Sequence, residues 1–474
     1  MIKTRIAPSP TGDPHVGTAY QALYNFVFAK QNAGHFIVRI EDTDRARFNP
    51  ESQKRILEML EWLGLPPDES PEKGGLSAPY IQTERAEMHR DYANQMLKNG
   101  KAYRAFDTPA ELEERRKASE ARKDSYRGYD RRDRDLSAAE SDARAAGGEP
   151  FAIRLKVPLT GETIVKDRLR GDVIFKNAEL DDKVILKADG LPTYHLAAMC
   201  DDHDMGITHV IRAEEWLVST PIHILIFEAF GWTQPEWIHT PWLLNADKTK
   251  LSKRKGDVSV DSYKAKGLIP EALLNYLGMM GWTMPTGNEI FSVSDMIEHF
   301  SWDRVSLGGS VFDFEKLTWL NGKYIREVLS LETLTERAKP FLVSAGFDVS
   351  DHEYVSSVVQ ILRERFNLLS ELPQKVAYFF KDIELEEKAA LKLQEGREHL
   401  RALLPQLEAA SNWDQATLEP IFKGYAENSG AKLGAVMQPL RAALTGRLES
   451  PGMFEVLSVL GKVKCLERIH RQVP

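Results

Sequence analysis

Cysteine is scarce in this chain, because Cys200 and Cys465 are the two cysteines among 474 residues. One pair cannot form the disulfide framework on which small secreted proteins depend, and the two are not spaced as a Cys-x-x-Cys metal clip. Both are typical of small apolar side chains in a reducing compartment. We therefore predict a protein that works in such a compartment.

Long apolar runs and a basic excess are also lacking. The start, Met1 to Pro8, has no apolar run of the kind that begins a secretion signal. No later stretch approaches the ~20 apolar residues that a membrane-spanning helix needs. The formal net charge of −8 excludes a small basic nucleic-acid binder, although a local basic groove stays compatible with it. We expect a soluble cytoplasmic protein with no membrane partner.

The first 65 residues alternate between strand and helix signals. Residues 4–7 predict a strand, residues 16–34 a helix, residues 36–41 a second strand and residues 55–63 a second helix. Such alternation predicts a parallel sheet with right-handed crossovers, whose ligands lie beyond the carboxyl ends of the strands. The loop from Pro8 to Thr18 and Glu41 should therefore share one rim.

The middle of the chain differs in composition from the first 65 residues. Between residues 111 and 142 the sequence is dense in charge, which indicates either a solvated helix face or a nucleic-acid surface. Strand-like segments follow, so an α+β module interrupts the α/β pattern, which resumes near residue 193. The strand-like segments are 151–157, 162–165, 172–175 and 183–186. Beyond about residue 330 strand signals fade, and amphipathic stretches at 355–369, 386–404 and 431–444 predict a helical C-terminal third.

The loop that precedes the first helix is suited to phosphate. It reads Ser9-Pro-Thr-Gly-Asp-Pro-His15-Val-Gly17-Thr18. A helix N-terminus presents unpaired N–H groups and a partial positive charge. Gly17 would let a nucleotide approach the backbone, and His15 can donate a hydrogen bond to a phosphate oxygen. Taken alone, the same residues also fit ordinary helix capping.

A second loop is strongly cationic. Asp247-Lys-Thr-Lys250-Leu-Ser-Lys253-Arg254-Lys255-Gly256 mixes Lys and Arg with Ser and Gly, which is poorly suited to a packed element. It is either a solvated surface loop or a set of charges that closes over a triphosphate as negative charge develops on the departing pyrophosphate.

Together the two loops resemble the signature motifs of class I aminoacyl-tRNA synthetases, His-Ile-Gly-His and Lys-Met-Ser-Lys-Ser. This chain has His15-Val-Gly-Thr18 and Lys250-Leu-Ser-Lys253-Arg254, so a threonine replaces the second histidine of the family. The resemblance implies the catalytic residues His15, Thr18, Lys250 and Lys253. It implies an ATP site made of Gly17, Ser252, Lys253, Arg254, Glu215 and Trp216.

Longer motifs resemble bacterial glutamyl-tRNA synthetases over essentially the whole chain. Arg5-Ile-Ala-Pro-Ser9, Arg39-Ile-Glu41, Leu191-Pro-Thr-Tyr194-His195 and Arg212-Ala-Glu-Glu215-Trp216 follow in the right order, as do Leu307-Gly-Gly and Asn321-Gly-Lys-Tyr-Ile. The resemblance implies a glutamate pocket made of Arg5, Ala7, Ser9, Glu41, Tyr194 and Arg212. This choice fits glutamate, because Arg5 and Arg212 can grip carboxylates, Tyr194 is a neutral donor and Glu41 can take the ammonium.

Two relatives of that family are less similar. Glutaminyl-tRNA synthetases usually read Pro-Glu-Pro-Asn-Gly where this chain has Pro8-Ser-Pro-Thr-Gly12, and they tend to end in β-barrels. The relative that glutamylates queuosine stops before the anticodon domains. Two other classes stay open from the residues alone, namely a small-molecule nucleotidyltransferase and a tRNA-binding paralogue without catalysis.

The resemblance implies an α/β fold of six segments. A Rossmann-like parallel-sheet catalytic domain carries an α+β acceptor-binding insertion, and a stem-contact domain and an all-α anticodon-binding region follow. The expected bounds are 1–83 and 188–258 for the catalytic halves, 84–187 for the insertion, 259–329 for the stem-contact domain, and 330–386 and 387–474 for the two anticodon-binding domains.

The implied reaction is the ligation of L-glutamate to tRNA(Glu) through glutamyl-adenylate, with ATP and Mg²⁺ and no covalent enzyme intermediate. Arg363 and Arg365 are the expected anticodon contacts. Residues 102–106, where some members hold zinc, contain no cysteine, so we expect no zinc. We also expect a monomer that binds no DNA. Whether tRNA(Gln) is also charged, whether activation needs bound tRNA and which loops close on ATP stay open.

Overall fold

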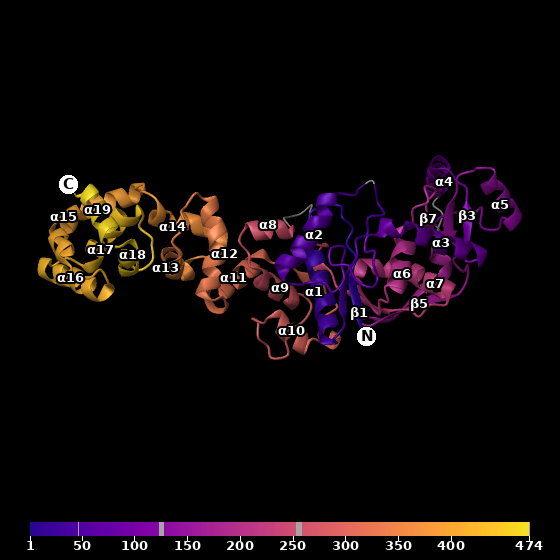
Figure 1. Ribbon diagram of the computed structural model, residues 1–474, viewed down its shortest axis with the longest axis horizontal. Coiled ribbons are helices and arrows are strands. Elements are labelled where there is room, and N and C mark those ends of the chain that lie inside the picture. The colour runs from indigo at the N-terminus through magenta and orange to yellow at the C-terminus, as the bar shows by residue number, and fades with distance from the viewer. Residues whose placement is uncertain (46, 123–127, 253–257, 474) are drawn as a thin grey trace. The chain divides into compact units, whose positions relative to one another are not determined.

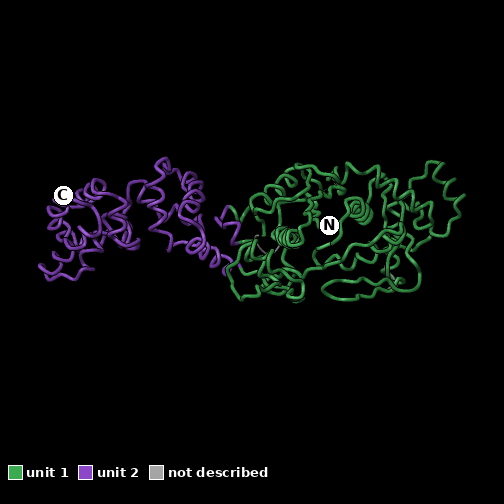
Figure 2. The backbone as a smooth tube through the Cα atoms, turned by 60° about the horizontal axis from the view of Figure 1, so that its bottom comes forward, with its two compact units in different colours: residues 1–264, 273–313 green, residues 265–272, 314–474 purple. Residues whose placement is uncertain are grey.

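The computed structural model describes residues 1–45, 47–122, 128–252 and 258–473. These residues form two compact units, which Figure 2 shows in green and purple. The N-terminal unit comprises Met1–Lys264 and Leu273–Asp313, and the C-terminal unit comprises Ala265–Ala272 and Phe314–Pro474. Both units are therefore built from segments that are not continuous in the sequence.

The N-terminal unit begins with the strand–helix–strand–helix order that the sequence predicts. The elements are β1 (Lys3–Ile6), α1 (Val16–Gln31), β2 (His35–Val38) and α2 (Pro50–Leu63) (Figure 1). β1 and β2 pair in parallel, with Lys3 opposite His35 and Ile6 opposite Val38. Parallel pairing requires the crossover that α1 supplies.

The parallel pattern resumes after the insertion. α6 (Tyr194–Asp204) leads to β8 (His209–Ala213), η3 (Glu214–Ser219), α7 (Thr220–Phe230) and β9 (Glu236–Thr240). β8 and β9 pair in parallel, and the N–H of Thr208 just before β8 donates to the carbonyl of Lys3 in β1 at 3.0 Å. The Rossmann-like arrangement expected for the catalytic region is confirmed.

The segment between these halves carries two different sheets. Its helical parts are η1 (Gln82–Arg85), α3 (Ala86–Lys98), α4 (Pro109–Arg122), α5 (Ala138–Ala146) and η2 (Asn177–Glu179). β3 (Ala102–Ala105), β4 (Ala152–Leu155) and β7 (Val184–Leu186) form an antiparallel sheet. β5 (Glu162–Asp167) and β6 (Gly171–Lys176) form a hairpin that instead joins β9, where Asp167 pairs with Trp237. The hairpin thus extends the sheet of β8 and β9.

The charged run of the middle segment is solvated in its helical parts. α4 and α5 bury none of their residues. Arg116 of α4 pairs with Glu113 and Glu120, one helical turn away on either side. Pairs at this spacing contribute only a few tenths of a kcal/mol each, roughly 0.3–0.5. Exposed charge on these two helices is compatible with both interpretations of the run, a solvated face and a nucleic-acid surface.

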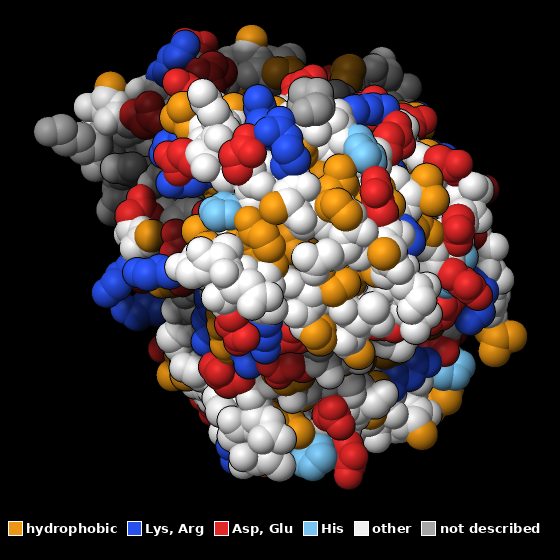
Figure 3. Space-filling model, turned by 90° about the vertical axis from the view of Figure 1, so that its left-hand side faces the viewer, with side chains coloured by type: hydrophobic (Ala, Val, Ile, Leu, Met, Phe, Trp, Pro, Cys, Tyr) orange, Lys and Arg blue, Asp and Glu red, His pale blue; other side chains and the backbone are white. Residues whose placement is uncertain are grey.

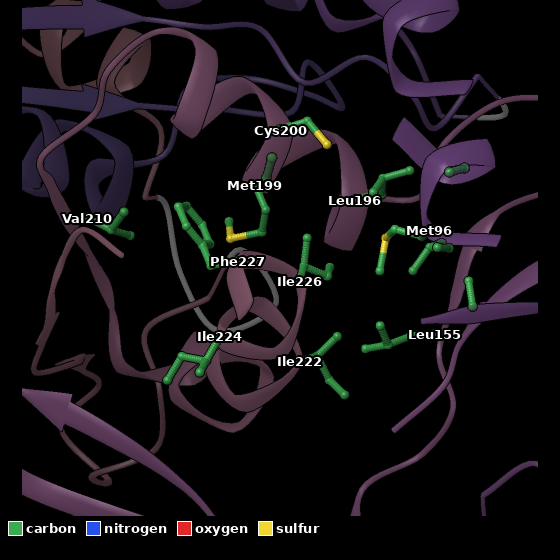
Figure 4. Packing of buried hydrophobic residues seen from close by; sticks show 14 of the residues in the cluster. Met96, Leu155, Leu196, Met199, Cys200, Val210, Ile222, Ile224, Ile226 and Phe227 are labelled. Carbon is green, nitrogen blue, oxygen red and sulfur yellow. The ribbon is translucent and has the colours of Figure 1, made fainter. Parts of the chain in front are cut away.

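A shared apolar core holds the inserted segment against the parallel halves. Figure 4 shows side chains of Met199 and Cys200 from α6 beside those of Ile226 and Phe227 from α7, and Met96 of α3 belongs to the same buried cluster. Both cysteines are free and buried, and burial raises the pKa of the Cys465 thiol to about 12. Both behave as the small apolar residues that the sequence predicts.

The N-terminal unit ends in short elements after β9, and the described part of the C-terminal unit contains helices and no strand. The short elements of the N-terminal unit include β10 (Leu243–Leu244), α10 (Val293–His299), η4 (Trp302–Arg304) and β11 (Ser310–Val311). The division between the two units falls inside α8 (Val260–Ala265) and inside α9 (Pro270–Met279). The helices of the C-terminal unit are α11 (Phe314–Lys323), η5 (Tyr324–Val328), α12 (Leu331–Ser344), α13 (His352–Leu362), η6 (Arg363–Arg365), η7 (Leu369–Glu371), α14 (Leu372–Phe380), α15 (Glu387–Ala409), α16 (Gln415–Ser429), α17 (Leu433–Thr445), α18 (Met453–Leu460) and α19 (Lys462–Gln472). The helical C-terminal region is confirmed.

The surface of the C-terminal end carries both signs of charge. Figure 3 shows Lys and Arg side chains interspersed with Asp and Glu on this face, and apolar side chains lie between them. The net charge of the chain is therefore not gathered into one acidic patch on this face. Across the described ranges no helix is both long and apolar enough to cross a bilayer.

Candidate active site

A cavity of about 1040 Å³ lies in the N-terminal unit, where β1, β2, β8 and β9 reach their carboxyl ends. Its wall is drawn from segments that are far apart in the sequence. The predicted site residues among its lining are Arg5, Ala7, Ser9, His15, Gly17, Thr18, Glu41, Tyr194, Arg212, Glu215, Trp216, Lys250 and Ser252. The fold thus brings together the described residues that the sequence assigns to glutamate and to ATP.

Two predicted residues of the cationic loop cannot be placed. Lys253 and Arg254 lie outside the described residues, so their expected roles stay predictions from the motif. Segments that flank the two signature loops do meet, however. Val16 N–H donates to the carbonyl of Val258 at 2.8 Å, and Val260 N–H donates to that of Pro14 at 3.1 Å. The backbone therefore links the start of α1 to the chain that follows the cationic loop.

His15 is the N-cap of α1. Its Nδ1 accepts a hydrogen bond from the backbone N–H of Gly17 at 2.9 Å, which satisfies one of the donors that a helix start leaves unpaired. A Cβ on Gly17 would lie 3.0 Å from Nδ1, so a side chain there would press on the imidazole ring. The capping interpretation is therefore correct. Because protein acceptors take the first N–H groups of α1, the helix start can attract an anion through its dipole and its side chains.

Arg5 and Glu41 belong to one buried network of charges. Arg5 donates to Asp202 from Nε at 3.1 Å and from Nη2 at 3.0 Å. Arg39 joins Asp202 at 2.8 Å and Glu41 at 3.1 Å. The two-pronged grip that the sequence predicts between Arg5 and a substrate carboxylate is thus already directed at Asp202, which the sequence interpretation missed.

Glu41 is a carboxyl group with an unusual pKa. Burial raises its pKa to about 7, against the neighbouring charges of Arg39 and Arg5, which lower it. A carboxyl group at that balance is half ionised near neutral pH, and a cationic partner in the cavity would favour its ionised form. Glu41 is therefore poised to receive an ammonium group.

Arg212 is buried at the end of β8 and is held by several groups. Nη1 donates to the hydroxyl of Tyr194 at 3.0 Å, and Nη2 donates to that of Thr220 at 2.8 Å. Nε faces Nε2 of His239 at 3.1 Å. Thr220 and His239 are absent from the predicted site. His239 lies in the mostly buried strand β9, where a polar side chain needs a buried partner.

Glu215 connects the strand end to the cationic loop. Its carboxylate lies 2.7 Å from Nζ of Lys250 and accepts a hydrogen bond from Nε1 of Trp242 at 3.1 Å. The ring of Trp216 packs on that of Tyr194 with centroids 4.6 Å apart. Flat, half-exposed Trp216 is suited to contact a purine base, and Trp242 is a lining residue that the sequence interpretation missed.

The two predicted anticodon contacts differ in their surroundings within the C-terminal unit. Arg363 is half-buried and donates to the backbone carbonyls of Ile325, at 2.7 Å from Nε, and of Leu329. Arg365 is exposed at the end of η6. Burial, and then the charge of Arg365, lowers the pKa of Arg441. Arg365 is therefore the member of the pair whose side chain is available on the surface.

Within the inserted segment, Asp182 is the centre of a group of charged and hydroxyl side chains. Asp182 accepts hydrogen bonds from Tyr103 of β3 at 2.8 Å and from Arg131 at 3.2 Å, and Arg134 lies 2.5 Å from it. The guanidinium of Arg154 in β4 donates to the backbone carbonyl of Asp182. The buried carboxylate of Asp182 thus joins β3 to the segment that holds Arg131 and Arg134, and its backbone carbonyl adds a contact to β4.

Comparison with known families agrees with this geometry. The profile of tRNA synthetases class I (E and Q), catalytic domain, matches residues 1–319, and that of the anticodon binding domain matches residues 333–473. The chain is similar to a glutamate–tRNA ligase of Thermus thermophilus, with 56% identity over 99% of each chain. It is 48% identical to that of Deinococcus radiodurans, over 99% of this chain and 98% of the relative.

A solved structure is similar over the whole length. The glutamate tRNA ligase of Elizabethkingia meningosepticum, crystallised in complex with its amino acid, has a TM-score of 0.91 with 37% identity, and the match covers 100% of this chain and 99% of that one. Full-length similarity of this degree, with both family profiles in order, excludes the alternative of a small-molecule nucleotidyltransferase. The chain belongs to the bacterial glutamate–tRNA ligases, a family of class I tRNA synthetases.

Proposed function

We propose that this glutamate–tRNA ligase binds glutamate and MgATP side by side in the cavity at the carboxyl ends of β1, β2, β8 and β9. The observation that carries the proposal is that one cavity is lined by cations, anions and a helix start from separate segments of the chain. Such a convergence of charge of both signs suits an amino acid with two carboxylates and one ammonium.

Glutamate would be held by groups on three sides. Arg212, together with the hydroxyl of Tyr194, receives one carboxylate. Arg5 receives the other through Nη1, because its Nε and Nη2 already face Asp202. Glu41 takes the ammonium, and a charged hydrogen bond of this kind is about twice as strong as a neutral one. Ala7 and Ser9 belong to the same wall, at the end of β1.

ATP would lie on the other side of the cavity, against the start of α1. The positive end of the α1 dipole, with the side chains of His15 and Thr18 and the backbone at Gly17, would face the phosphates. Lys250 and Ser252 from the cationic loop and Glu215 and Trp216 from the end of β8 would complete the site. The motif adds Lys253 and Arg254. The Glu215–Lys250 ion pair joins the segment after β8 to the cationic loop within this ATP site.

The chemistry needs no covalent bond to the protein. An oxygen of the glutamate α-carboxylate attacks the α-phosphorus of ATP, the bond from that phosphorus to the bridging oxygen breaks, and pyrophosphate leaves with the electron pair. A ribose hydroxyl of the terminal adenosine of the tRNA then attacks the glutamyl carbonyl and AMP leaves. The protein contributes by positioning the two substrates and by stabilising the charge that develops on pyrophosphate.

The tRNA would contact both units. We propose the acceptor end for the inserted segment 84–187, the stem for 259–329 and the anticodon for the helical domains 330–386 and 387–474. Arg365 is exposed, and its charge contributes to lowering the pKa of Arg441, so the two guanidinium groups lie near each other. Two nearby cations support a site for a base and its phosphate. We further propose a cytoplasmic monomer that carries no structural zinc and binds neither DNA nor membranes.

The decisive assay is ATP–pyrophosphate exchange with the purified chain. We expect exchange that depends on glutamate, and the experiment with and without tRNA decides whether bound tRNA is needed for activation. Glutamine in place of glutamate is the matched control and should give no exchange. Absence of exchange under every condition would refute the proposal. Charging of purified tRNA(Glu) and tRNA(Gln) side by side then decides whether the enzyme accepts both.

A further inference from the structure

Arg212 differs from Arg5 in the kind of partner that holds it. Arg5 faces the carboxylate of Asp202, so part of its charge is already neutralised. Within the described residues, the groups at hydrogen-bonding distance from the guanidinium of Arg212 are all neutral. They are the hydroxyls of Tyr194 and Thr220, the backbone carbonyl of Trp216, and the imidazoles of His223 and His239. The positive charge of Arg212 is thus not neutralised by these partners, while the neutral acceptors fix the orientation of its guanidinium group.

His239 occupies a special position among these acceptors. It lies on β9 directly opposite Arg212 of β8 in the parallel register, so the two side chains can meet on one face of the sheet. Its Nε2 lies 3.1 Å from Nε of Arg212. Because an arginine Nε always carries a proton, this contact is a hydrogen bond only when Nε2 of the histidine bears the lone pair.

Asp167 determines where the proton of His239 sits. This last residue of β5 accepts at Oδ2 from Nδ1 of His239 at 2.7 Å and from its backbone N–H at 3.0 Å. Its other oxygen accepts from the backbone N–H groups of Leu169 and Arg170 at 3.0 and 2.9 Å. A carboxylate only accepts, so the imidazole proton is held on Nδ1 and Nε2 is left to face the arginine.

We propose that Asp167 and His239 are a positioning pair for Arg212, which they aim at a carboxylate of the bound glutamate. The inference rests on the proposed role of Arg212 in the glutamate site. Asp167 fixes the tautomer and the ring orientation of His239, and His239 fixes the rotation of the guanidinium about its Nε. Neither residue lines the cavity, so both act through Arg212.

The imidazole between Asp167 and Arg212 has a physical purpose. A carboxylate in direct contact with Arg212 would form a buried ion pair and would compete with the substrate carboxylate for the same N–H groups. A neutral imidazole is oriented by the carboxylate of Asp167 and in turn orients the guanidinium of Arg212, and it leaves the charge of that guanidinium unpaired. Burial, with the charge of Arg212, lowers the pKa of His239 to about 4, so the ring is neutral at physiological pH.

The test compares three variants in steady-state aminoacylation with each substrate varied in turn. Asp167→Asn keeps the shape but permits the wrong tautomer, and His239→Phe removes the acceptor. Each should raise the KM for glutamate about tenfold or more, because a charged hydrogen bond is lost, while the KM for ATP and for tRNA stays within about twofold. His239→Gln places an amide oxygen near the former Nε2 and should restore most of the glutamate affinity.

Two controls separate this role from a general effect on folding. Glu236→Gln neutralises a carboxylate on the same strand, away from the cavity, and should leave all three KM values unchanged. Arg212→Gln tests the proposed site itself and should raise the KM for glutamate more than either positioning variant does. The melting temperature of each variant is measured alongside.

The outcomes are distinguishable. A selective rise of the glutamate KM in Asp167→Asn and His239→Phe, with rescue by His239→Gln, supports the positioning pair. If Arg212→Gln loses glutamate affinity but the other two variants keep it, the pair has no such role. If the three substrate KM values rise together with a fall in melting temperature, the role is structural and the inference is wrong. If Arg212→Gln itself binds glutamate normally, the proposed glutamate site fails, and the inference fails with it.

Discussion

At the scale of single residues, the cavity combines groups whose charge depends on their surroundings. Burial alone would neutralise Glu41, and the guanidinium groups of Arg39 and Arg5 oppose that effect, which leaves the pKa at about 7. Arg212 is held by neutral groups and is free to pair with a ligand. In the proposed site the charge of Arg212 would be paired only when a substrate carboxylate binds, which is a physical basis for selecting an amino acid with two carboxylates over its amide.

The pKa of Glu41 predicts a pH dependence for glutamate use. Below pH 7 the carboxyl group is protonated and can no longer pair with the ammonium, so kcat/KM for glutamate should rise with pH through about 7 and then level off. The measurement is aminoacylation between pH 6 and 8.5 with glutamate varied. In Glu41→Gln the activity should be low and this inflection should be absent. A wild-type profile that is flat across pH 7 would contradict the assignment.

A second prediction at this scale concerns Lys253, whose role comes from the motif. Lys253→Ala should lower the rate of glutamate activation by about 10²-fold or more, because the cation stabilises charge that develops only in the transition state. The affinity for tRNA should change little. Pyrophosphate exchange and tRNA binding measured on the same preparation check both parts, and an unchanged exchange rate would remove Lys253 from the mechanism.

At the scale of elements, the start of α1 combines stability with function. The ring of His15 lies over the N–H of Gly17, so a Cβ at that glycine would be only 3.0 Å from Nδ1 and would push on the ring. The same helix start borders the cavity. One small residue thus allows a histidine to cap the helix at the place where phosphate would bind.

Gly17→Ala should therefore be harmful although alanine is the better helix former. The new Cβ displaces the ring, the cap is lost at a cost of about 1 kcal/mol, and the KM for ATP should rise. Gly424→Ala is the matched control, because Gly424 lies in α16 with open space around its Cβ position, so that change should stabilise the protein by roughly 0.5–1 kcal/mol. Thermal unfolding and ATP kinetics of both variants decide the matter. Equal behaviour of the two would contradict this account.

Elements also show where prediction from the sequence stops. The strand signals at residues 162–165 and 172–175 are correct, since β5 and β6 form there. Their period of two reveals which side chains share a face but not which strand lies alongside. The sequence interpretation places them with the inserted module, whereas β5 pairs with β9 and brings Asp167 to His239. The pair that positions Arg212 depends on that pairing.

At the scale of the whole molecule, the proposed substrate cavity and the proposed anticodon contact lie in different compact units. The cavity belongs to the N-terminal unit, and the exposed end of η6 belongs to the C-terminal unit. A change at the second should therefore alter which tRNA is charged while leaving the chemistry of activation intact.

The two arginines of η6 give a paired prediction. Arg365→Gln should relax selection at the last anticodon base, because its exposed side chain is the proposed contact. Arg363→Gln should instead lower the melting temperature, because it removes hydrogen bonds to the backbone carbonyls of Ile325 and Leu329. Charging of tRNA transcripts that differ at that base tests the first effect and thermal unfolding tests the second. Unaltered selection in Arg365→Gln would refute the contact.

The sequence by itself determined the alternation of strands and helices in the first 65 residues, the helical C-terminal third and the two signature loops. Each of these features depends on neighbouring residues, through hydrophobic periodicity, helix caps and turn residues. It can therefore be predicted without knowledge of distant contacts. Arg5, Glu41, Tyr194 and Arg212 could be named for the same reason, because short local motifs mark them and the family fixes their order.

Only the tertiary structure decided how those residues are held. Asp202 faces Arg5 across 197 positions of sequence, and Asp167 faces His239 across 72. Contacts at such separations arise from strand pairing and helix packing, which a local pattern does not encode. The residues proposed to meet the substrates could thus be named from the sequence, while those that orient Arg5 and Arg212 were set by the fold.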